Sequence, residues 1–399
     1  MLLAARWLLT GVTPPIEQGA ILIEDGIIRD IGTRQWFAKK DISEVIDLGE
    51  TILVPGLVNA HAHLEHSALK SPQPPGGQRG ISFTAWVRTL QEKSSQISPS
   101  ENEKAIKYAI DELIRGGTTT LVDHRSPDCP PIETPFREML FLELIGPSKS
   151  KAEESRRNGL KWLEENDDPE RPCHLTPHSL YSVHPDILQE AFSAGTTLSL
   201  HLLESDEEEQ FFRSRQGPLF ELVRSRGGSP LRAESPVAWI EEHRSNDTNI
   251  LLIHGNYLKE DEIRRLKGQN AFVIHCPGSH RFFGPRAFPY ESYIRCGIRI
   301  GLGTDSLASN ESLNMLRQMK LMKETTHLGE EDILRMATLN GAMAIGVENE
   351  IGTLEVGKKA DIVGVPLLNQ KVDPYEALLL PDQVSFSMVR GRVIFCTHP

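Results

Sequence analysis

Residues 54–63 have the sequence Val-Pro-Gly-Leu-Val-Asn-Ala-His-Ala-His, so an apolar run leads directly into two histidines. The run predicts a buried strand, and residues two apart in an extended chain point to the same side. His61 and His63 can therefore direct both imidazoles at one ion. A His-X-His pair is common by chance, but its place directly after an apolar strand favours a metal site.

The same alternation of an apolar, β-branched run with a polar or helical segment recurs through the middle of the chain. It gives eight candidate strands, at residues 52–58, 118–122, 139–145, 174–176, 197–200, 250–253, 272–274 and 298–302. Residues 101–115 and 330–344 carry apolar residues at helical spacing. This pattern predicts an α/β fold in which residues 54–349 form a (β/α)8 TIM barrel.

Both ends of the chain have the composition of β-structure. Within residues 19–31 an Asp-Gly pair separates two β-branched runs, which is a strong hairpin signal. Residues 360–365 and 386–395 again form short apolar runs that are broken by glycine. We therefore expect residues 1–53 and 350–399 to form one small β-sandwich domain built from both termini.

The composition limits the partners of the protein. The 43 Lys and Arg residues against 55 Asp and Glu residues give a formal net charge of −12, which argues against nucleic acid or an anionic membrane surface. The apolar start at residues 1–10 is interrupted by Arg6 and is shorter than the roughly 20 apolar residues of a membrane span. The five cysteines are scattered and form no Cys-X-X-Cys pair, so we expect no disulfide scaffold and a cytoplasmic location.

Three further candidate strands end in residues that can bind a metal. His201 follows the fifth candidate strand, His254 the sixth and Asp305 the eighth. The carboxyl ends of barrel strands meet at one face, so these side chains are expected to join the two histidines of the first strand. Each residue alone is more typical of a hydrogen-bonded core position. Together, their imidazole and carboxylate groups suit Zn²⁺ or Fe²⁺.

The motifs resemble those of the amidohydrolase superfamily over nearly the whole chain. The matching elements are residues 55–63, His201 with Glu204, His254, residues 275–279, residues 302–310 and the tail at 352–361. Within the superfamily, the His-X-X-Glu and His-Cys-Pro-X-Ser motifs are similar to the ATZ/TRZ-like branch, which deaminates nucleobases, nucleosides and related heterocycles with one metal ion. The resemblance implies an aminohydrolase that acts on C–N bonds of cyclic amidines.

The resemblance also implies roles for individual residues. The implied metal ligands are His61, His63, His201 and Asp305. A divalent ion lowers the pKa of its bound water from about 15.7 towards about 7, so that hydroxide can attack the carbon that bears the amino group. Asp305 would accept the water proton and His254 would orient the water, while Glu204 would protonate the ring nitrogen and help ammonia leave.

Two positions keep alternatives open. Glu204 begins an acidic run, residues 204–209, that has the composition of a solvated helix start, where the helix dipole alone favours a glutamate. Glu143 lies in the third candidate strand, where a bridging carboxylate would serve a second metal. Bimetallic members of the superfamily need a bridging lysine or glutamate at the end of the third or fourth strand. No lysine stands near these ends, so the resemblance implies a single ion, zinc or iron, and disfavours a second one.

Several residues are predicted to bind the substrate. They are His178, Glu65, Trp86, Arg281 and Ser309. His178 belongs to a Thr-Pro-His-Ser-Leu-Tyr-Ser segment that resembles a substrate-facing stretch of the branch. Arg281 is suited to a substrate carboxylate because a guanidinium makes bidentate, charge-assisted hydrogen bonds to it. His124, after the second candidate strand, is expected at the pocket mouth.

Within the branch, the segments around residues 61–67, 83–86 and 281–284 are most similar to the aminodeoxyfutalosine deaminases of an alternative route to menaquinone. The expected substrate is then 6-amino-6-deoxyfutalosine, an adenine-type nucleoside that carries a benzoate. Adenosine, S-adenosylhomocysteine, methylthioadenosine and guanine stay open, as does displacement of chloride from a triazine. A non-catalytic scaffold is disfavoured because the ligand residues are present. The expected partner is a small molecule, and a homodimer is left open.

Overall fold

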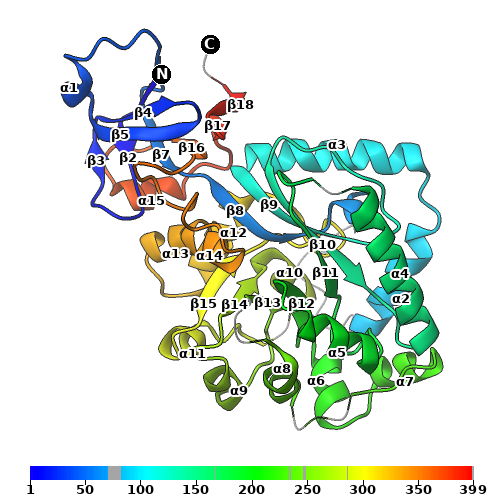
Figure 1. Cartoon of the computed structure of the whole chain (residues 1–399). Coiled ribbons are helices and arrows are strands. Elements are labelled where there is room, and N and C mark those ends of the chain that lie inside the picture. The colour runs from blue at the N-terminus through cyan, green and yellow to red at the C-terminus, as the bar shows by residue number, and fades with distance from the viewer. Residues whose placement is uncertain are drawn as a thin grey trace.

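The computed structural model describes residues 1–70, 82–166, 168–231, 233, 235–245, 249–284 and 286–397. Figure 1 shows two parts, a barrel surrounded by helices and a smaller β-structure that contains both the N-terminal and the C-terminal segments. The predicted α/β fold, a (β/α)8 barrel with a β-sandwich from both termini, is confirmed. The expected domain boundaries stay a prediction, and strand β7 (Thr51–Pro55) crosses the first of them.

Eight parallel strands form the barrel. The first four form one hydrogen-bonded sheet, and they are β8 (Leu57–Ala62), β9 (Thr118–Arg125), β10 (Arg137–Leu144) and β11 (Cys173–Pro177). The other four form a second sheet, and they are β12 (Leu198–Leu202), β13 (Ile250–His254), β14 (Ala271–His275) and β15 (Arg299–Leu302). Parallel bridges from Ser179 to His201 and from Ala62 to Asp305 join the two sheets on both sides. The strand ends therefore converge on one face.

Helices cover the outside of the barrel (Figure 1). They include α3 (Pro99–Arg115), α4 (Lys149–Glu165), α5 (Pro185–Ser193), α8 (Pro236–His243), α9 (Glu260–Arg265), α11 (Tyr290–Arg295) and α12 (Met315–Thr325). Helix α3 shows why the sequence forms helix: Ser98 and Glu101 make a reciprocal capping box, and proline follows the cap. Its buried Ala109 and Leu113 pack with Leu121 of β9. No helix of the described chain is long and apolar enough to cross a membrane.

The β-sandwich consists of two sheets. One contains β1 (Leu2–Ala4), β4 (Gly19–Glu24), β5 (Ile27–Thr33) and β6 (Val45–Asp47). The other contains β2 (Trp7–Leu8), β3 (Ile16–Glu17), β7, β16 (Ile362–Pro366), β17 (Phe386–Val389) and β18 (Arg392–Cys396). A shared core includes Ile21, Leu53 and Phe386. The predicted hairpin joins β4 to β5, and Asp25 and Gly26 both have positive φ, as such turns require.

Two predicted elements are each divided in the structure. The candidate strand at 52–58 is two strands, because β7 pairs antiparallel with β16 in the sandwich before β8 enters the barrel after Gly56. The helical range 330–344 is also two helices, α13 (Glu330–Met336) and α14 (Leu339–Ala344). Their break lies at Thr338, whose φ of −132° and ψ of −90° are not helical.

Candidate active site

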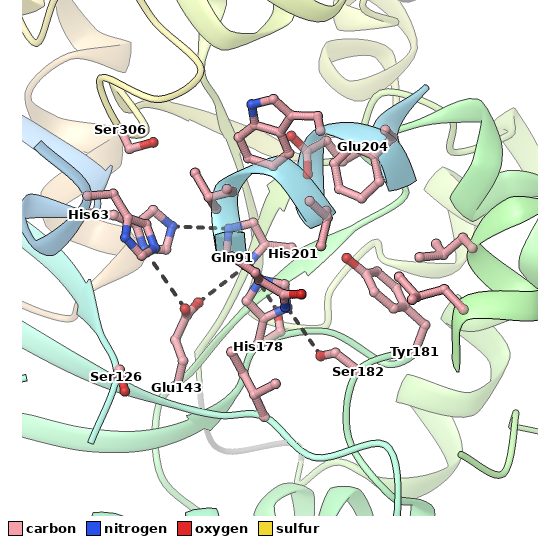
Figure 2. Close-up of a pocket in the computed structure, with 18 of the residues that line it drawn as sticks. His63, Gln91, Ser126, Glu143, His178, Tyr181, Ser182, His201, Glu204 and Ser306 are labelled. Carbon is pink, nitrogen blue, oxygen red and sulfur yellow. Dashed lines mark hydrogen bonds and ion pairs between the residues drawn. The ribbon is translucent and has the colours of Figure 1, made fainter. Parts of the chain in front are cut away.

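The carboxyl ends of four barrel strands bring the predicted metal and catalytic residues together. His61 and His63 lie at the end of β8, His201 in β12, His254 at the last position of β13 and Asp305 just after β15. All five side chains are buried. One ligand-capable atom from each of His61, His63 and His201 lies within 4.8 Å of the others. Figure 2 shows His63 and His201 directed toward one another.

The spacing of the imidazoles fits a metal ion. The Nε2 atoms of His63 and His201 are 3.4 Å apart, and two nitrogens bound tetrahedrally at about 2.0–2.1 Å lie about 3.4 Å apart. The Nε2 atom of His61 is buried and has no hydrogen-bond partner among the described residues. Burial, with neighbouring histidines, lowers the pKa of His61 and of His63 well below the ordinary value. Neutral rings keep the lone pairs that a metal needs.

Asp305 provides a carboxylate beside these rings. Its Oδ1 atom lies 3.9 Å from His61 Nε2 and 4.0 Å from His63 Nε2. Its Oδ2 atom accepts hydrogen bonds from the hydroxyls of Ser279, at 2.8 Å, and Ser309, at 2.7 Å. Asp305 also has a φ of +59°, in a region that non-glycine residues rarely adopt. The two serines and this turn hold Oδ1 toward the histidines, so the donor set fits one divalent ion.

Glu204 and His254 form a second pair at the same face. Glu204 Oε1 lies 3.5 Å from His254 Nε2. One ligand-capable atom from each of Glu204, His254 and Asp305 lies within 4.8 Å of the others. His254 has a φ of +70°, so it too occupies a strained turn at a strand end. Burial raises the pKa of Glu204 well above its ordinary value, and the carboxylates of Asp305 and Glu208 add to the effect. This environment favours the protonated form of the carboxyl group.

The sequence suggested that the acidic run at residues 204–209 is a solvated helix start. In the structure, much of this run is buried. Helix α6 begins only at Asp206 (Asp206–Arg213), and Glu204, Glu207 and Glu208 are buried. Glu207 accepts hydrogen bonds from the backbone N–H and the hydroxyl of Thr84. Glu208 accepts the backbone N–H of Glu204 at 2.9 Å, and burial raises the pKa of Glu208 to about 7. These contacts fix the backbone beside Glu204.

Glu143, at the end of β10, lies on the other side of the histidine rings. Its Oε1 atom is 3.5 Å from His201 Nδ1, and its Oε2 atom is 3.9 Å from His63 Nδ1. Burial raises the pKa of Glu143 well above its ordinary value. His201 Nδ1 also donates to the carbonyl of His178 at 3.0 Å. Because Glu143 faces the Nδ1 atoms and not the Nε2 atoms, it is not a ligand of the ion that those Nε2 atoms would hold.

A cavity of about 420 Å³ opens over this face. Three residues that were predicted to bind substrate line it: His178, Glu65 and Trp86. The ring of His178 stacks on His201 with a centroid distance of 4.4 Å. Glu65 Oε1 accepts the backbone N–H of Ser126 at 3.0 Å, so its carboxylate is partly engaged.

Two other substrate-side predictions are not supported by the positions of the residues. Arg281 is 61% exposed and lies 3.9 Å from Glu324, outside the cavity lining. In helix α10 (Pro277–Phe283), Ser279 faces Asp305, and a residue two positions on lies about 200° further around the helix. Ser309 is fully buried and bonds Asp305 instead of lining the cavity. It positions the carboxylate.

One wall of the cavity, apart from Trp86, was not predicted from the sequence. It is formed by residues of helices α2 (Phe83–Ser94) and α7 (Pro218–Ser225) and by Arg226, which follows α7. Tyr181 and Ser182 also line the cavity beside His178 (Figure 2). The available signal was the helical spacing of Leu219, Leu222 and Val223 in the sequence, which marks one face of α7.

His124 was expected at the pocket mouth. In the structure it lies beneath the predicted metal ligands instead. It is fully buried, with Nδ1 at 3.1 Å from His61 Nδ1 and Nε2 at 2.7 Å from the hydroxyl of Ser199. When His61 binds through Nε2, its Nδ1 carries the proton and donates to His124 Nδ1. His124 then donates through Nε2 to Ser199. This chain fixes the tautomer of His61 that leaves Nε2 free.

Replacing His124 by leucine is therefore expected to weaken zinc binding by about tenfold or more, because contacts of this kind orient ligands. His124→Asn, whose amide oxygen can accept the same proton, is expected to recover part of the affinity. The zinc dissociation constant, measured by chelator competition, checks this expectation. An unchanged constant in His124→Leu, with a native far-UV spectrum, would remove the assigned positioning role.

Comparison with known proteins agrees with this geometry. The model of the Amidohydrolase family matches residues 52–394. Curated relatives include the 5-methylthioadenosine/S-adenosylhomocysteine deaminases of Pyrococcus furiosus, 27% identical over 88% of this chain and 83% of the relative, and of Moorella thermoacetica, 28% identical over 90% and 84%. The chain belongs to the amidohydrolase family. It is an enzyme of the hydrolase class.

Solved structures show the same fold. The crystal structure of Helicobacter pylori aminofutalosine deaminase in complex with methylthio-coformycin has a TM-score of 0.83 and 24% identity, and the match covers 99% of this chain and 100% of that one. A zinc-bound adenosine deaminase from Xanthomonas campestris has a TM-score of 0.81 and 22% identity, with 99% and 92% covered. At these identities the structures establish the shared barrel and sandwich.

Proposed function

We propose that this hydrolase removes the exocyclic amino group from an adenine-type nucleoside with the help of one divalent metal ion, zinc or iron. The observation that carries the proposal is the placement of Glu204 and His254, 3.5 Å apart, beside the histidine and aspartate donor set at the base of one cavity. Deamination needs a water to attack and a group that protonates the ring nitrogen. The donor set would activate the water, and Glu204 would protonate the ring nitrogen, within one cavity.

His61, His63, His201 and Asp305 would hold the ion. A bound divalent ion lowers the pKa of the attacking water. Asp305 accepts the proton of that water, while His254 Nε2 hydrogen-bonds and orients its oxygen. The buried site excludes bulk water around these groups, which strengthens each electrostatic contact.

Glu204 provides the second proton transfer. Its pKa is raised by burial, so the carboxyl group can hold a proton and deliver it to the ring nitrogen next to the attacked carbon. The negative charge that develops there on attack is neutralised by this proton. After the transfer, the carboxylate can receive the second proton of the attacking oxygen and pass it to the leaving amino group, so that ammonia departs. The proton that Asp305 took from the water then returns to Glu204, one of whose oxygens lies within 4.8 Å of an Asp305 oxygen, and both groups recover their starting states.

For the substrate itself we propose 6-amino-6-deoxyfutalosine, which would place the enzyme in menaquinone biosynthesis. A solved structure with this fold is an aminofutalosine deaminase, and the cavity is within the size range of sites for drug-sized ligands. The curated relatives are named for methylthioadenosine and S-adenosylhomocysteine, which are the main competing substrates. A cytoplasmic location and a homodimer stay predictions.

The test is ammonia release by the metal-replete enzyme from 6-amino-6-deoxyfutalosine, adenosine, S-adenosylhomocysteine, methylthioadenosine and guanine. We expect the highest kcat/KM with 6-amino-6-deoxyfutalosine. A higher value with methylthioadenosine or S-adenosylhomocysteine would keep the reaction and replace the substrate. No ammonia from any compound, together with chloride release from a chlorotriazine, would overturn the proposed deamination.

A further inference from the structure

The active-site cavity continues away from the metal ligands along two helices, α2 and α7, which lie on the same side of the barrel (Figure 1). The residues of α2 that line it are Phe83, Trp86, Val87, Leu90, Gln91 and Ser94. Leu219, Leu222 and Val223 of α7 and Arg226, which directly follows that helix, also line it. Both sets have spacings of three and four residues, so each helix presents one continuous face to the cavity.

The two ends of this wall make different contacts. At its inner end, Trp86 Nε1 donates to the carbonyl of Ala308 at 3.3 Å, three residues after Asp305. At its outer end, the guanidinium of Arg226 donates to Gln91 Oε1 at 2.7 Å. Between these ends the lining is apolar. A ligand whose base lies against Glu204 therefore runs past an apolar surface before it reaches Arg226.

Arg226 differs in two respects from the rest of the lining and from its neighbours. Among the described residues that line the cavity, Arg226 is the only lysine or arginine. Four lining residues are carboxylic acids, namely Glu65, Glu143, Glu204 and Asp305. Within the described chain it has no ion pair, and its side chain hydrogen-bonds a neutral amide. Arg213 of α6, by contrast, forms ion pairs with Glu209 and Glu262. The guanidinium of Arg226 is thus available to an anion in the cavity.

We propose that Arg226 makes the enzyme selective for adenine-type nucleosides whose 5′ arm is apolar and ends in a carboxylate. This inference rests on the proposed function, because it takes the base to lie at the metal end. The wall of Phe83, Trp86 and Leu222 accommodates the apolar part of the arm, and the guanidinium binds its carboxylate through charge-assisted hydrogen bonds. Arg226 thereby takes the role that the sequence had suggested for Arg281.

The test compares 6-amino-6-deoxyfutalosine with its carboxamide derivative, in which the anion is replaced by a neutral group of similar size. In Arg226→Gln, KM for the acid is expected to rise about tenfold or more. The value of kcat is expected to stay within about twofold, because the lost contact is far from the reacting carbon and equally strong in the ground state and in the transition state. For the carboxamide, KM is expected to change by less than about threefold. Added salt should raise KM for the acid more in the wild type than in the variant.

Matched variants separate selectivity from general damage. Arg224→Gln removes the same charge from an exposed position of α7, two residues before Arg226, that does not line the cavity, and it is expected to leave both KM values unchanged. Arg226→Lys is expected to recover part of the preference for the acid. Equal KM changes for acid and carboxamide in Arg226→Gln would overturn the inference, while deamination itself would stand. A wild-type enzyme that releases no ammonia from either compound would instead overturn the substrate named in the proposed function.

Discussion

Replacing Glu204 by glutamine is expected to lower kcat for deamination about a thousandfold, while the protein still binds its metal ion. The effect is large because general acid–base catalysis contributes about 10²–10⁴-fold, and this carboxyl group is the proton carrier nearest to His254, at 3.5 Å. A glutamine side chain has nearly the same shape and keeps hydrogen bonds, but it cannot transfer a proton.

Steady-state ammonia release and the zinc content of the purified variant together check this prediction. Glu221→Gln, at an exposed position of α7 outside the cavity lining, is the matched control and should behave as wild type. If Glu204→Gln kept more than about a tenth of the wild-type kcat with normal zinc content, proton transfer would have to be assigned to another group.

The grouping of the candidate metal-binding residues could be predicted from sequence because strand geometry repeats. A buried strand alternates its side chains and ends at a defined edge, so His61, His201 and Asp305 could be placed at one face from their positions after apolar runs alone. The structure brings them together through parallel pairing of neighbouring strands and through the bridge between Ala62 and Asp305. Short-range pattern was sufficient there.

The substrate wall could not be predicted in this way. Gln91 and Arg226 are 135 residues apart in sequence, yet they hydrogen-bond at the outer end of the cavity. No spacing rule links them, because their contact depends on how α2 and α7 pack over different barrel strands. Arg281 was chosen because a guanidinium suits a substrate carboxylate, but the turn of α10 directs it outward to Glu324. Chemistry without tertiary placement did not show that Arg281 lies outside the cavity lining.

The burial of Glu207 and Glu208 could not be predicted for the same reason, because it depends on tertiary contacts. A run of acidic residues predicts a solvated surface when it is considered alone. In the fold, Thr84 of α2 provides hydrogen-bond donors to Glu207, and the backbone of Glu204 provides one to Glu208. Buried carboxyl groups with such partners hold the loop that carries Glu204, which makes the run part of the active site.

Removing the divalent ion with a chelator is expected to abolish deamination and to lower the melting temperature by several degrees. The ion would bind only the folded donor set, and an ion at a thousand times its dissociation constant contributes about 4 kcal/mol to the folded state. Without it, the buried His61 Nε2 atom has no hydrogen-bond partner in the described structure. His61, His63, His201 and Asp305, brought together by three strand ends, lose the ion that would bind them all.

Thermal unfolding with and without chelator, followed by addition of zinc, measures both effects. His201→Asn is expected to reproduce the chelated state and to resist rescue by zinc, since it removes one of the two nitrogens that lie 3.4 Å apart. His327→Asn changes an exposed histidine far from these ligands and should respond to chelation as the wild type does. Full activity in protein with no bound metal would contradict the donor-set assignment. Loss of activity that zinc restores in His327→Asn but not in His201→Asn would tie the reaction to this cluster, because the two variants differ only in which imidazole is lost.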